Sequence, residues 1–426
     1  MHYLSATREQ LQKEKEALLK QYSDILNKNY NLDMSRGKPG ADQLDISEEL
    51  LTVLSKNSDC ILDNGTDCRN YGIVDGIPEA KQLFAEILGV RAENVIVGGN
   101  SSLNLMYDAV VRGMILGVSR ESEPWMKVGN VKFLCPSPGY DRHFGICESL
   151  GIEMIPVDMT PDGPDMDMVE KYVNSDASVK GIWCVPKYSN PEGVTYSDET
   201  VKRFAALTPA AKDFRIFWDN AYVVHDLYDE SDRLLNILDE CEKAGNPDIV
   251  YMFTSTSKIS YPGAGVAAIA SSVKNIEYIK NVMTIQTIGH DKLNMLRHVR
   301  YFKNADGVRA YMKRHAEILR PKFNIVLDAF DNELSETGVA EWRTPRGGYF
   351  ISLNVIDGCA KRVISLCKEA GIVLTGAGAA FPYHNDPRDR NIRVAPSYPP
   401  CEDLKCAVDV LCLCVKLACV EKLLGE

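Results

Sequence analysis

A lysine inside a hydroxyl-rich segment is the first residue whose surroundings suggest chemistry. Lys258 follows the apolar run 249–253 and four serine or threonine residues, and a glycine-rich turn comes after it. Partial burial lowers the pKa of a lysine amine and turns it into a nucleophile that can form a Schiff base. The alternative is a solvated loop lysine, which is the usual fate of this residue type.

An aspartate and an arginine stand beside other apolar runs. Asp219 follows residues 215–218, which predicts that it ends a buried strand, where α/β proteins place ligands. The alternative is that it caps the next helix. Arg393 lies between apolar neighbours, and its guanidinium can hold a carboxylate with two hydrogen bonds. The alternative is an internal salt bridge to Asp386 or Asp389.

The segment 95–105 predicts a strand, a glycine turn and the start of a helix. Asn100, Ser101 and Ser102 open that helix. Free backbone N–H groups, the helix dipole and two hydroxyls can together hold a phosphate. Asn and Ser are also ordinary capping residues, so the segment alone fits an anion site and a simple helix cap equally well.

Elements that could position these residues follow a regular order. Helical stretches alternate with short apolar runs between about residues 79 and 300, which predicts a mostly parallel sheet with helices on both faces. A stripe over residues 4–26 predicts one or two amphipathic helices, and a smaller α+β domain with a closing helix at 402–424 should share their core. The apolar runs are 95–97, 131–134, 154–157, 181–185, 215–218 and 249–253.

Composition excludes several classes of protein. The 426 residues are 45% hydrophobic and 25% charged, as in folded globular proteins of two or three domains. The 48 Lys and Arg against 59 Asp and Glu give a net charge of −11, which disfavours nucleic acid and anionic membranes as partners. Thirteen cysteines without disulfide spacing, and no apolar segment typical of a signal or a membrane span, predict a reduced, cytoplasmic protein.

Other patterns carry less weight. Gly263-x-Gly265-x-x-Ala268 has the form of a dinucleotide fingerprint, but it follows the lysine loop rather than a strand end. His143 and His225 could line a pocket or serve structure. No HExxH, GxSxG or CxxC pattern supports a metal site or a hydrolase. We expect the cysteines of the last helix in the core: Cys401, Cys406, Cys412, Cys414 and Cys419.

Eight motifs stand in order along nearly the whole chain: SRGKPG, NYGIVDGIPEAK, GGNSS, PSPGYDRH, YSNPEG, DNAY, STSK and NIRV. In this order and spacing they resemble one family, the class I aminotransferases of pyridoxal-phosphate fold type I. SRGKPG with TSTSKISYPGAGVA looks most like subgroup Ic of the aspartate aminotransferases. The resemblance implies an α/β fold with a mostly parallel seven-stranded sheet in a large domain, 49–305, and a small α+β domain built from 1–48 and 306–426.

The resemblance also implies a role for each matched residue. Lys258 would carry pyridoxal phosphate as an internal aldimine and then shuttle the proton as general base and acid, and Asp219 would pair with the pyridine nitrogen. Arg393 would take the substrate α-carboxylate, with Arg36 and the Gly37 backbone beside it. The other implied cofactor contacts are Asn190 and Tyr222 at the phenolic oxygen, Tyr140 on the ring face, Asn100, Ser101, Ser102, Ser255 and Ser257 around the phosphate, and Tyr71 from the second subunit of a homodimer.

The substrate and the phosphate partner are less defined. Most class I members carry an arginine eight residues after the lysine, where this chain has Val266, so another cation or the hydroxyls and helix N-terminus must meet the phosphate. We expect ping-pong transfer of an amino group between aspartate or glutamate and 2-oxoglutarate. Candidates for a second carboxylate are Arg36, Lys38, Arg142 and Arg297.

Other functions remain compatible with the same residues. A β-lyase or decarboxylase would use the same lysine and aspartate, and the amino acid could instead be alanine or aromatic. A non-enzymatic, DNA-bound regulator is disfavoured, because about thirty residues before SRGKPG are too few for a winged helix and the charge is negative.

Overall fold

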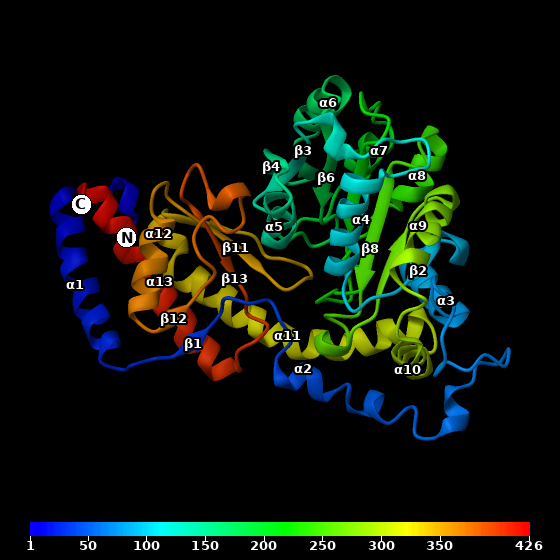
Figure 1. Ribbon diagram of the computed structural model, residues 1–426. Helices are drawn as coiled ribbons and strands as arrows, with labels where there is room; N and C mark the ends of the chain where they lie inside the picture. Colours follow the sequence, from blue (N-terminus) through cyan, green and yellow to red (C-terminus); the bar gives the residue numbers. More distant parts are fainter.

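The computed structural model describes residues 1–426 and consists of two lobes joined by one long helix (Figure 1). The left lobe in that view holds both chain ends, and the right lobe holds the large sheet. Helix α11 (Ala305–Glu333) runs from one lobe to the other. Its early residues Val308 and Met312 belong to a core beneath the sheet, whereas Phe323 and Phe330 belong to the core of the other lobe.

The large sheet has eight strands rather than the seven that the resemblance implied. In spatial order the strands are β2 (Val95–Val97), β9 (Ala267–Ala270), β8 (Val250–Ser255), β7 (Arg215–Asp219), β6 (Val179–Cys184), β3 (Lys132–Ser137), β4 (Glu153–Thr160) and β5 (Gly163–Pro164). Strand β9 pairs antiparallel with both β2 and β8, and β5 pairs antiparallel with the end of β4 at the sheet edge, whereas the other pairs are parallel. The two-residue β5 has no apolar run in the sequence that could predict it.

Helices cover both faces of this sheet, as the alternating pattern predicted. Along β8, Val250 and Met252 enter one core, while Tyr251 and Phe253 enter the other, because successive side chains of a strand point to opposite faces. The first core contains α3 (Pro78–Leu88), α6 (Met166–Ser175), α7 (Asp198–Ala205), α8 (Ile237–Ala244) and α10 (Lys292–Phe302). The second contains α4 (Ser102–Leu116), α5 (Asp141–Ser149) and α9 (Val273–Gln286).

The other lobe is built from both ends of the chain. An antiparallel sheet contains β10 (Ala340–Trp342), β11 (Ile351–Val355) and β13 (Asn391–Val394), while β1 (Leu32–Asp33) pairs in parallel with β12 (Ile372–Val373). Helices α1 (Arg8–Leu26), α12 (Ala360–Glu369) and α13 (Cys401–Leu424) pack around them, and the short α2 (Ala41–Asp45) leads into the other lobe. The exact boundaries at 48/49 and 305/306 stay predictions, since α11 contributes to both lobes.

Two expectations from sequence patterns meet different outcomes. Cys412, Cys414 and Cys419 are buried in α13 as predicted, but the prediction is wrong for Cys401 and Cys406, which lie on the exposed face of its first turns. The glycine pattern 263–268 crosses a 3-10 turn and enters β9, and no helix begins there. That geometry excludes the dinucleotide fingerprint, which needs a helix N-terminus.

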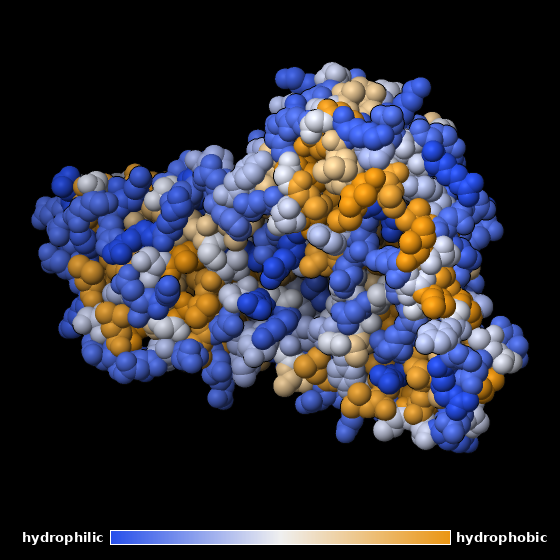
Figure 2. Space-filling view, in the orientation of Figure 1, coloured by the Kyte–Doolittle hydropathy of each residue, from blue (hydrophilic) through white to orange (hydrophobic).

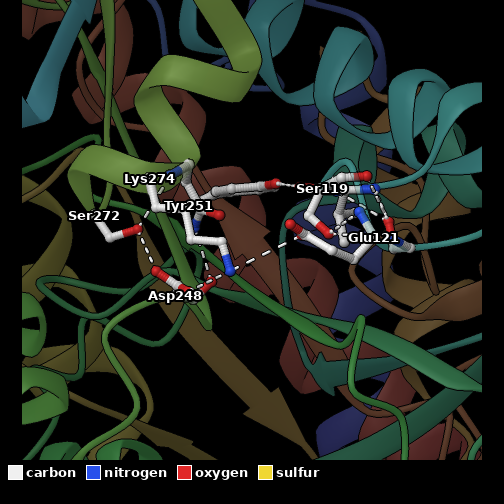
Figure 3. Close-up of polar contacts among 9 residues, drawn as sticks. Ser119, Glu121, Asp248, Tyr251, Ser272 and Lys274 are labelled. Atoms are coloured by element: carbon white, nitrogen blue, oxygen red, sulfur yellow. Dashed lines mark hydrogen bonds and ion pairs between the residues drawn. The ribbon is translucent and has the colours of Figure 1, made fainter.

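A polar cluster fastens the sheet at the end remote from Lys258 (Figure 3). Asp248 precedes β8, accepts a 2.6 Å hydrogen bond from Ser272 Oγ, and lies 3.6 Å from Lys274 Nζ. Tyr251 donates its hydroxyl to the Val118 carbonyl at 3.3 Å, and Glu121 follows in the same loop. These contacts hold the first turn of α9 and the loop after α4 against the amino end of β8.

None of the helices combines the length and apolar character that a membrane span requires.

Candidate active site

A cavity of about 260 Å³ lies at the carboxyl ends of β7 and β8, against the start of α4. This is the edge where parallel α/β sheets bind ligands. The cavity brings together nine of the residues singled out from sequence, although they are spread over some 160 positions. Those nine are Ser101, Ser102, Tyr140, Asn190, Asp219, Tyr222, Ser255, Ser257 and Lys258; Leu103, Val185, Ala221 and Pro262 complete the lining.

Lys258 enters this cavity from the turn after β8. Its Nζ lies 5.0 Å from the centroid of the Tyr222 ring and forms neither a hydrogen bond nor an ion pair. Burial lowers the pKa of this amine; the Asp219 carboxylate opposes that effect and the Arg393 charge adds to it. The structure therefore favours the unprotonated, nucleophilic form of Lys258 more than solvent does.

Asp219 ends β7, as its sequence position predicted, and it caps no helix. Its Oδ2 lies 3.1 Å from His143 Nε2, and the His143 ring stacks on Trp183 with centroids 4.5 Å apart. Its Oδ1 is buried without any hydrogen-bond partner. A buried carboxylate oxygen left in this way is costly unless a cationic or N–H group meets it. Asp219 is therefore fixed on one side and open to a ligand on the other.

Hydroxyl groups and a helix N-terminus form the opposite wall. Ser101 is the N-cap of α4 and accepts from the Asn104 amide, so the capping role suggested for it is present together with its place in the cavity. Ser255 donates to Ser257 Oγ at 3.0 Å. Lys258 is the single cationic side chain in the lining, and Val266 is buried with its amide donating to Thr256. Apart from Lys258, the lining offers an anion hydroxyls, backbone amides and the positive end of the α4 dipole.

Two tyrosines form the aromatic side of the cavity. Burial raises the pKa of Tyr140 to about 12 and moves that of Tyr222 well above its ordinary value, so both hydroxyls stay protonated near neutral pH. Tyr140 also meets the His143 ring edge-on, with centroids 4.9 Å apart. Both rings can therefore pack against a planar ligand while their O–H groups remain hydrogen-bond donors.

Arg393 approaches from β13 of the other lobe. Its Nη1 lies 2.8 Å from Asp141 Oδ1 and 3.4 Å from Asn190 Oδ1, so it pairs with neither of the two aspartates near it in sequence. Asp386 instead accepts the backbone N–H groups of residues 388, 390 and 391.

Phe350 is adjacent to both the Arg393 side chain and the glycine expected beside the substrate. The guanidinium carbon of Arg393 stands 5.0 Å from the centroid of the Phe350 ring. Gly37 packs so closely on the same ring that a Cβ at this position would lie 2.3 Å from Cζ of Phe350. Arg393 and Gly37 thus both lie against the Phe350 ring.

The remaining residues singled out from sequence lie outside this lining. Tyr71 is 83% exposed. Asn100 and Arg297 line a neighbouring cavity, and Arg36 is exposed. Lys38 is also exposed and stacks on Tyr398, and Arg142 is exposed on α5. The structure therefore brings none of the four proposed readers of a second carboxylate to the cavity wall.

Tyr349, His225 and Gln43 hold the Lys258 backbone. The sequence analysis identified neither Gln43 nor Tyr349, and His225 takes the structural role that was one of the two considered for it. The Lys258 carbonyl accepts from the Tyr349 hydroxyl at 3.2 Å, and His225 Nε2 lies 3.2 Å from the same oxygen. The pKa of His225 is lowered to about 3, mainly by burial and to a smaller extent by the nearby Lys258 charge, so the ring is neutral. Gln43 donates to the Tyr349 hydroxyl at 2.9 Å. No spacing in the sequence links residues 43, 225 and 349 to 258.

Comparison with known proteins decides the family. The family model for aspartate amino-transferase matches residues 6–426. The chain belongs to the aspartate aminotransferase family. The aspartate aminotransferase of Corynebacterium glutamicum is 48% identical over 406 residues, which cover 95% of this chain and 94% of that protein.

Solved structures of similar proteins agree with this fold and, at 48% identity, with this family. The crystal structure of an aspartate transaminase from Corynebacterium glutamicum superposes with a TM-score of 0.95, at 48% identity, over 97% of both chains. The α-aminoadipate aminotransferase of Thermus thermophilus, solved with N-(5′-phosphopyridoxyl)-L-leucine, has a TM-score of 0.74 at 19% identity over 93% of this chain and 95% of that one, which shows the shared fold. The chain is an aminotransferase with the α/β fold of type I.

Proposed function

We propose that this family member moves an amino group between aspartate or glutamate and a 2-oxo acid, 2-oxoglutarate, in two alternating half-reactions with pyridoxal phosphate. One observation carries the proposal: Lys258, with a lowered pKa and an unpaired amine, faces the same cavity as Asp219, with an unpartnered buried oxygen. The name of the Corynebacterium relative supports the choice of aspartate.

The residues around the cavity fit pyridoxal phosphate. Asp219 Oδ1 offers the anion that a protonated pyridine nitrogen needs, and the hydroxyls at the start of α4 and after β8 offer donors to a phosphate. When bound, the cofactor supplies an electron sink for the pair left on Cα as its proton leaves. We assign Asn190 and Tyr222 to the phenolic oxygen, Tyr140 to the ring face, and Ser101, Ser102, Ser255, Ser257 and the neighbouring Asn100 to the phosphate.

Lys258 would act twice in this reaction. Its amine would hold the cofactor before substrate enters. It would then take the proton from substrate Cα as a base and deliver it to the C4′ atom of the cofactor as an acid. An amine of lowered pKa is suited to both steps, because more of it is unprotonated at neutral pH. The hydrogen bond from Tyr349, and the His225 nitrogen 3.2 Å away, hold the Lys258 carbonyl, which limits where the amine can swing.

Arg393 would bind the substrate α-carboxylate beside Asn190. Its side chain is only 8% exposed, and a weakly hydrated guanidinium at the cavity edge favours a planar carboxylate. The Gly37 backbone, packed on Phe350, would close over the bound amino acid, with Arg36 nearby in the same segment. Arg36 is exposed and reaches no carboxylate of this chain, so its role in substrate binding requires the segment to close.

We also propose a homodimer in which each subunit completes the other's site. Tyr71 is 83% exposed, which suits a residue that reaches the phosphate of a second subunit. Figure 2 shows apolar side chains gathered on the visible face of the right lobe around α4, and this helix exposes Tyr107, Ile115 and Leu116. A second copy could cover this surface. Mixing Lys258→Ala with Tyr71→Ala protein should restore part of the activity if sites are shared between subunits.

The visible absorption spectrum tests the reaction. Cofactor-loaded protein should lose its absorption band on adding aspartate or glutamate and recover it on adding 2-oxoglutarate. An absorption band that stays unchanged on adding aspartate or glutamate, but is lost on adding alanine or an aromatic amino acid, would overturn the substrate assignment. Ammonia with pyruvate, or carbon dioxide, released without any oxo acid would indicate lyase or decarboxylase chemistry instead.

A further inference from the structure

The guanidinium assigned to the substrate already holds a carboxylate of this chain. Asp141 Oδ1 lies 2.8 Å from Arg393 Nη1. The two residues come from different lobes, since Asp141 is the first residue of α5 beside the large sheet and Arg393 lies in β13. Their contact is a charge-assisted hydrogen bond across the boundary at which the cavity opens.

Asp141 supplies the negative charge that balances this guanidinium. The Arg393 side chain is 8% exposed, and a buried cation without a counter-ion is strongly unfavourable. Its other polar contacts are neutral and long, 3.4 Å to Asn190 and 3.5 Å to Thr375, and its Nε is buried without an acceptor. Asp141 is therefore the one anion in contact with Arg393.

The position of Asp141 makes it a competitor for substrate. It occupies Nη1, the nitrogen that also faces Asn190 and hence the cavity. Its side chain is 25% exposed, so it can turn into solvent when another anion arrives. We propose that Asp141 is a resident carboxylate that holds Arg393 in the free enzyme and is displaced by the α-carboxylate of the substrate. This proposal rests on the proposed function, because it takes Arg393 as the α-carboxylate site.

Displacement affects affinity without dismantling the contact between lobes. A ligand that needs Arg393 free binds only the fraction of protein in which the Asp141 contact is broken. Its apparent affinity is the intrinsic affinity multiplied by that fraction. Other links across the boundary do not involve Arg393: the Gly139 amide donates to the Ala380 carbonyl at 2.7 Å, and the Met154 amide donates to the Tyr383 hydroxyl at 2.9 Å. Asp141 can therefore leave Arg393 while the lobes stay joined.

Asp141→Asn tests the competition directly. Succinate, a dicarboxylate without an amino group, can be titrated into cofactor-loaded and into cofactor-free protein by isothermal calorimetry. We expect succinate to bind about fivefold more tightly to Asp141→Asn than to wild type, the factor expected for a partly exposed ion pair. KM for aspartate should fall by a similar factor while kcat changes little. Asp141→Ser provides a second variant should the asparagine protein fail to fold.

Matched variants separate competition from other roles. Asp141→Glu should keep wild-type affinity, and Asp357→Asn, which removes an exposed pair with Arg388 at 3.0 Å, should leave succinate binding unchanged. Unchanged or weaker succinate binding by Asp141→Asn would overturn the proposal, since it would mean that Asp141 orients Arg393 for the substrate or does not affect it. If Arg393→Gln bound succinate as well as wild type, the assignment of Arg393 itself would fail.

Discussion

Replacing Asp219 by asparagine would remove one negative charge from the cavity and leave its shape almost unchanged. Asp219 Oδ2 lies 3.1 Å from His143 Nε2, a contact that an amide oxygen can keep, while Oδ1 is the unpartnered atom assigned to the pyridine nitrogen. We expect Asp219→Asn to fold and to bind pyridoxal phosphate. In this variant the pyridine nitrogen of the cofactor would lack a charged partner. The proton on substrate Cα should therefore leave far more slowly.

The burial of Asp219 sets the size of this effect. Its side chain is 3% exposed, so solvent cannot replace the lost charge. Removing one member of a buried ion pair costs about 3–5 kcal/mol. Because about 1.4 kcal/mol corresponds to a tenfold change in rate, the amino-acid half-reaction should slow by about 10²- to 10⁴-fold.

Stopped-flow absorption under single-turnover conditions measures the rate of this half-reaction without a contribution from product release. Aspartate is mixed with cofactor-loaded protein, and the decay of the cofactor band is recorded for wild type and Asp219→Asn. Asp213→Asn is the matched control, because Asp213 pairs with Lys180 at 2.6 Å in the same lobe and does not line the cavity. A decrease smaller than tenfold in Asp219→Asn would refute the role given to this carboxylate.

Three further predictions follow from individual contacts. Lys258→Ala should lose all measurable transamination, measured by coupled assay, while its circular dichroism spectrum and unfolding midpoint stay close to wild type; retained turnover would exclude Lys258 as the essential amine. Burial lowers the pKa of His225 to about 3 and those of His298 and His315 to about 4. Since the unfolded chain binds these protons first, stability should fall as pH drops below about 6.5, by about 2 kcal/mol per histidine at pH 5. Urea titrations at pH 7 and 5 measure this loss, and a histidine-to-glutamine variant as acid-sensitive as wild type would contradict it. Asp248→Ala should lower the free energy of unfolding by about 1 kcal/mol with kcat unchanged, because its hydrogen bond and ion pair lie at the far end of β8 (Figure 3).

The strands of the large sheet were predictable where they are apolar and β-branched or aromatic. Runs such as 215–218 and 249–253 became β7 and β8 within one or two residues. Strand β9 was not predicted, because its sequence, Ala-Ala-Ile-Ala, lies in a stretch dominated by small residues. Small side chains suit its buried place between β2 and β8 but do not indicate a strand. Burial between two neighbours, rather than intrinsic propensity, makes this segment a strand.

The candidate site was predictable where a functional residue follows a strand in sequence. Asp219 and Lys258 come directly after the apolar residues of β7 and β8, and neighbouring parallel strands bring their carboxyl ends together. The supports of Lys258 were not predictable in this way, because Gln43, His225 and Tyr349 reach it only through the packing of the two lobes.

Arg393 shows why a charged residue's partner is the hardest feature to predict from sequence. Asp386 and Asp389 are near in sequence, but the Asp386 carboxylate accepts three backbone N–H groups of its own turn instead. Asp141, some 250 positions away, becomes the partner because the two lobes meet at that point. The same meeting brings Arg393 to Asn190 at the edge of the cavity. A counter-ion selected by the contact between lobes is thus placed where an incoming carboxylate must compete with it, which local sequence could not reveal.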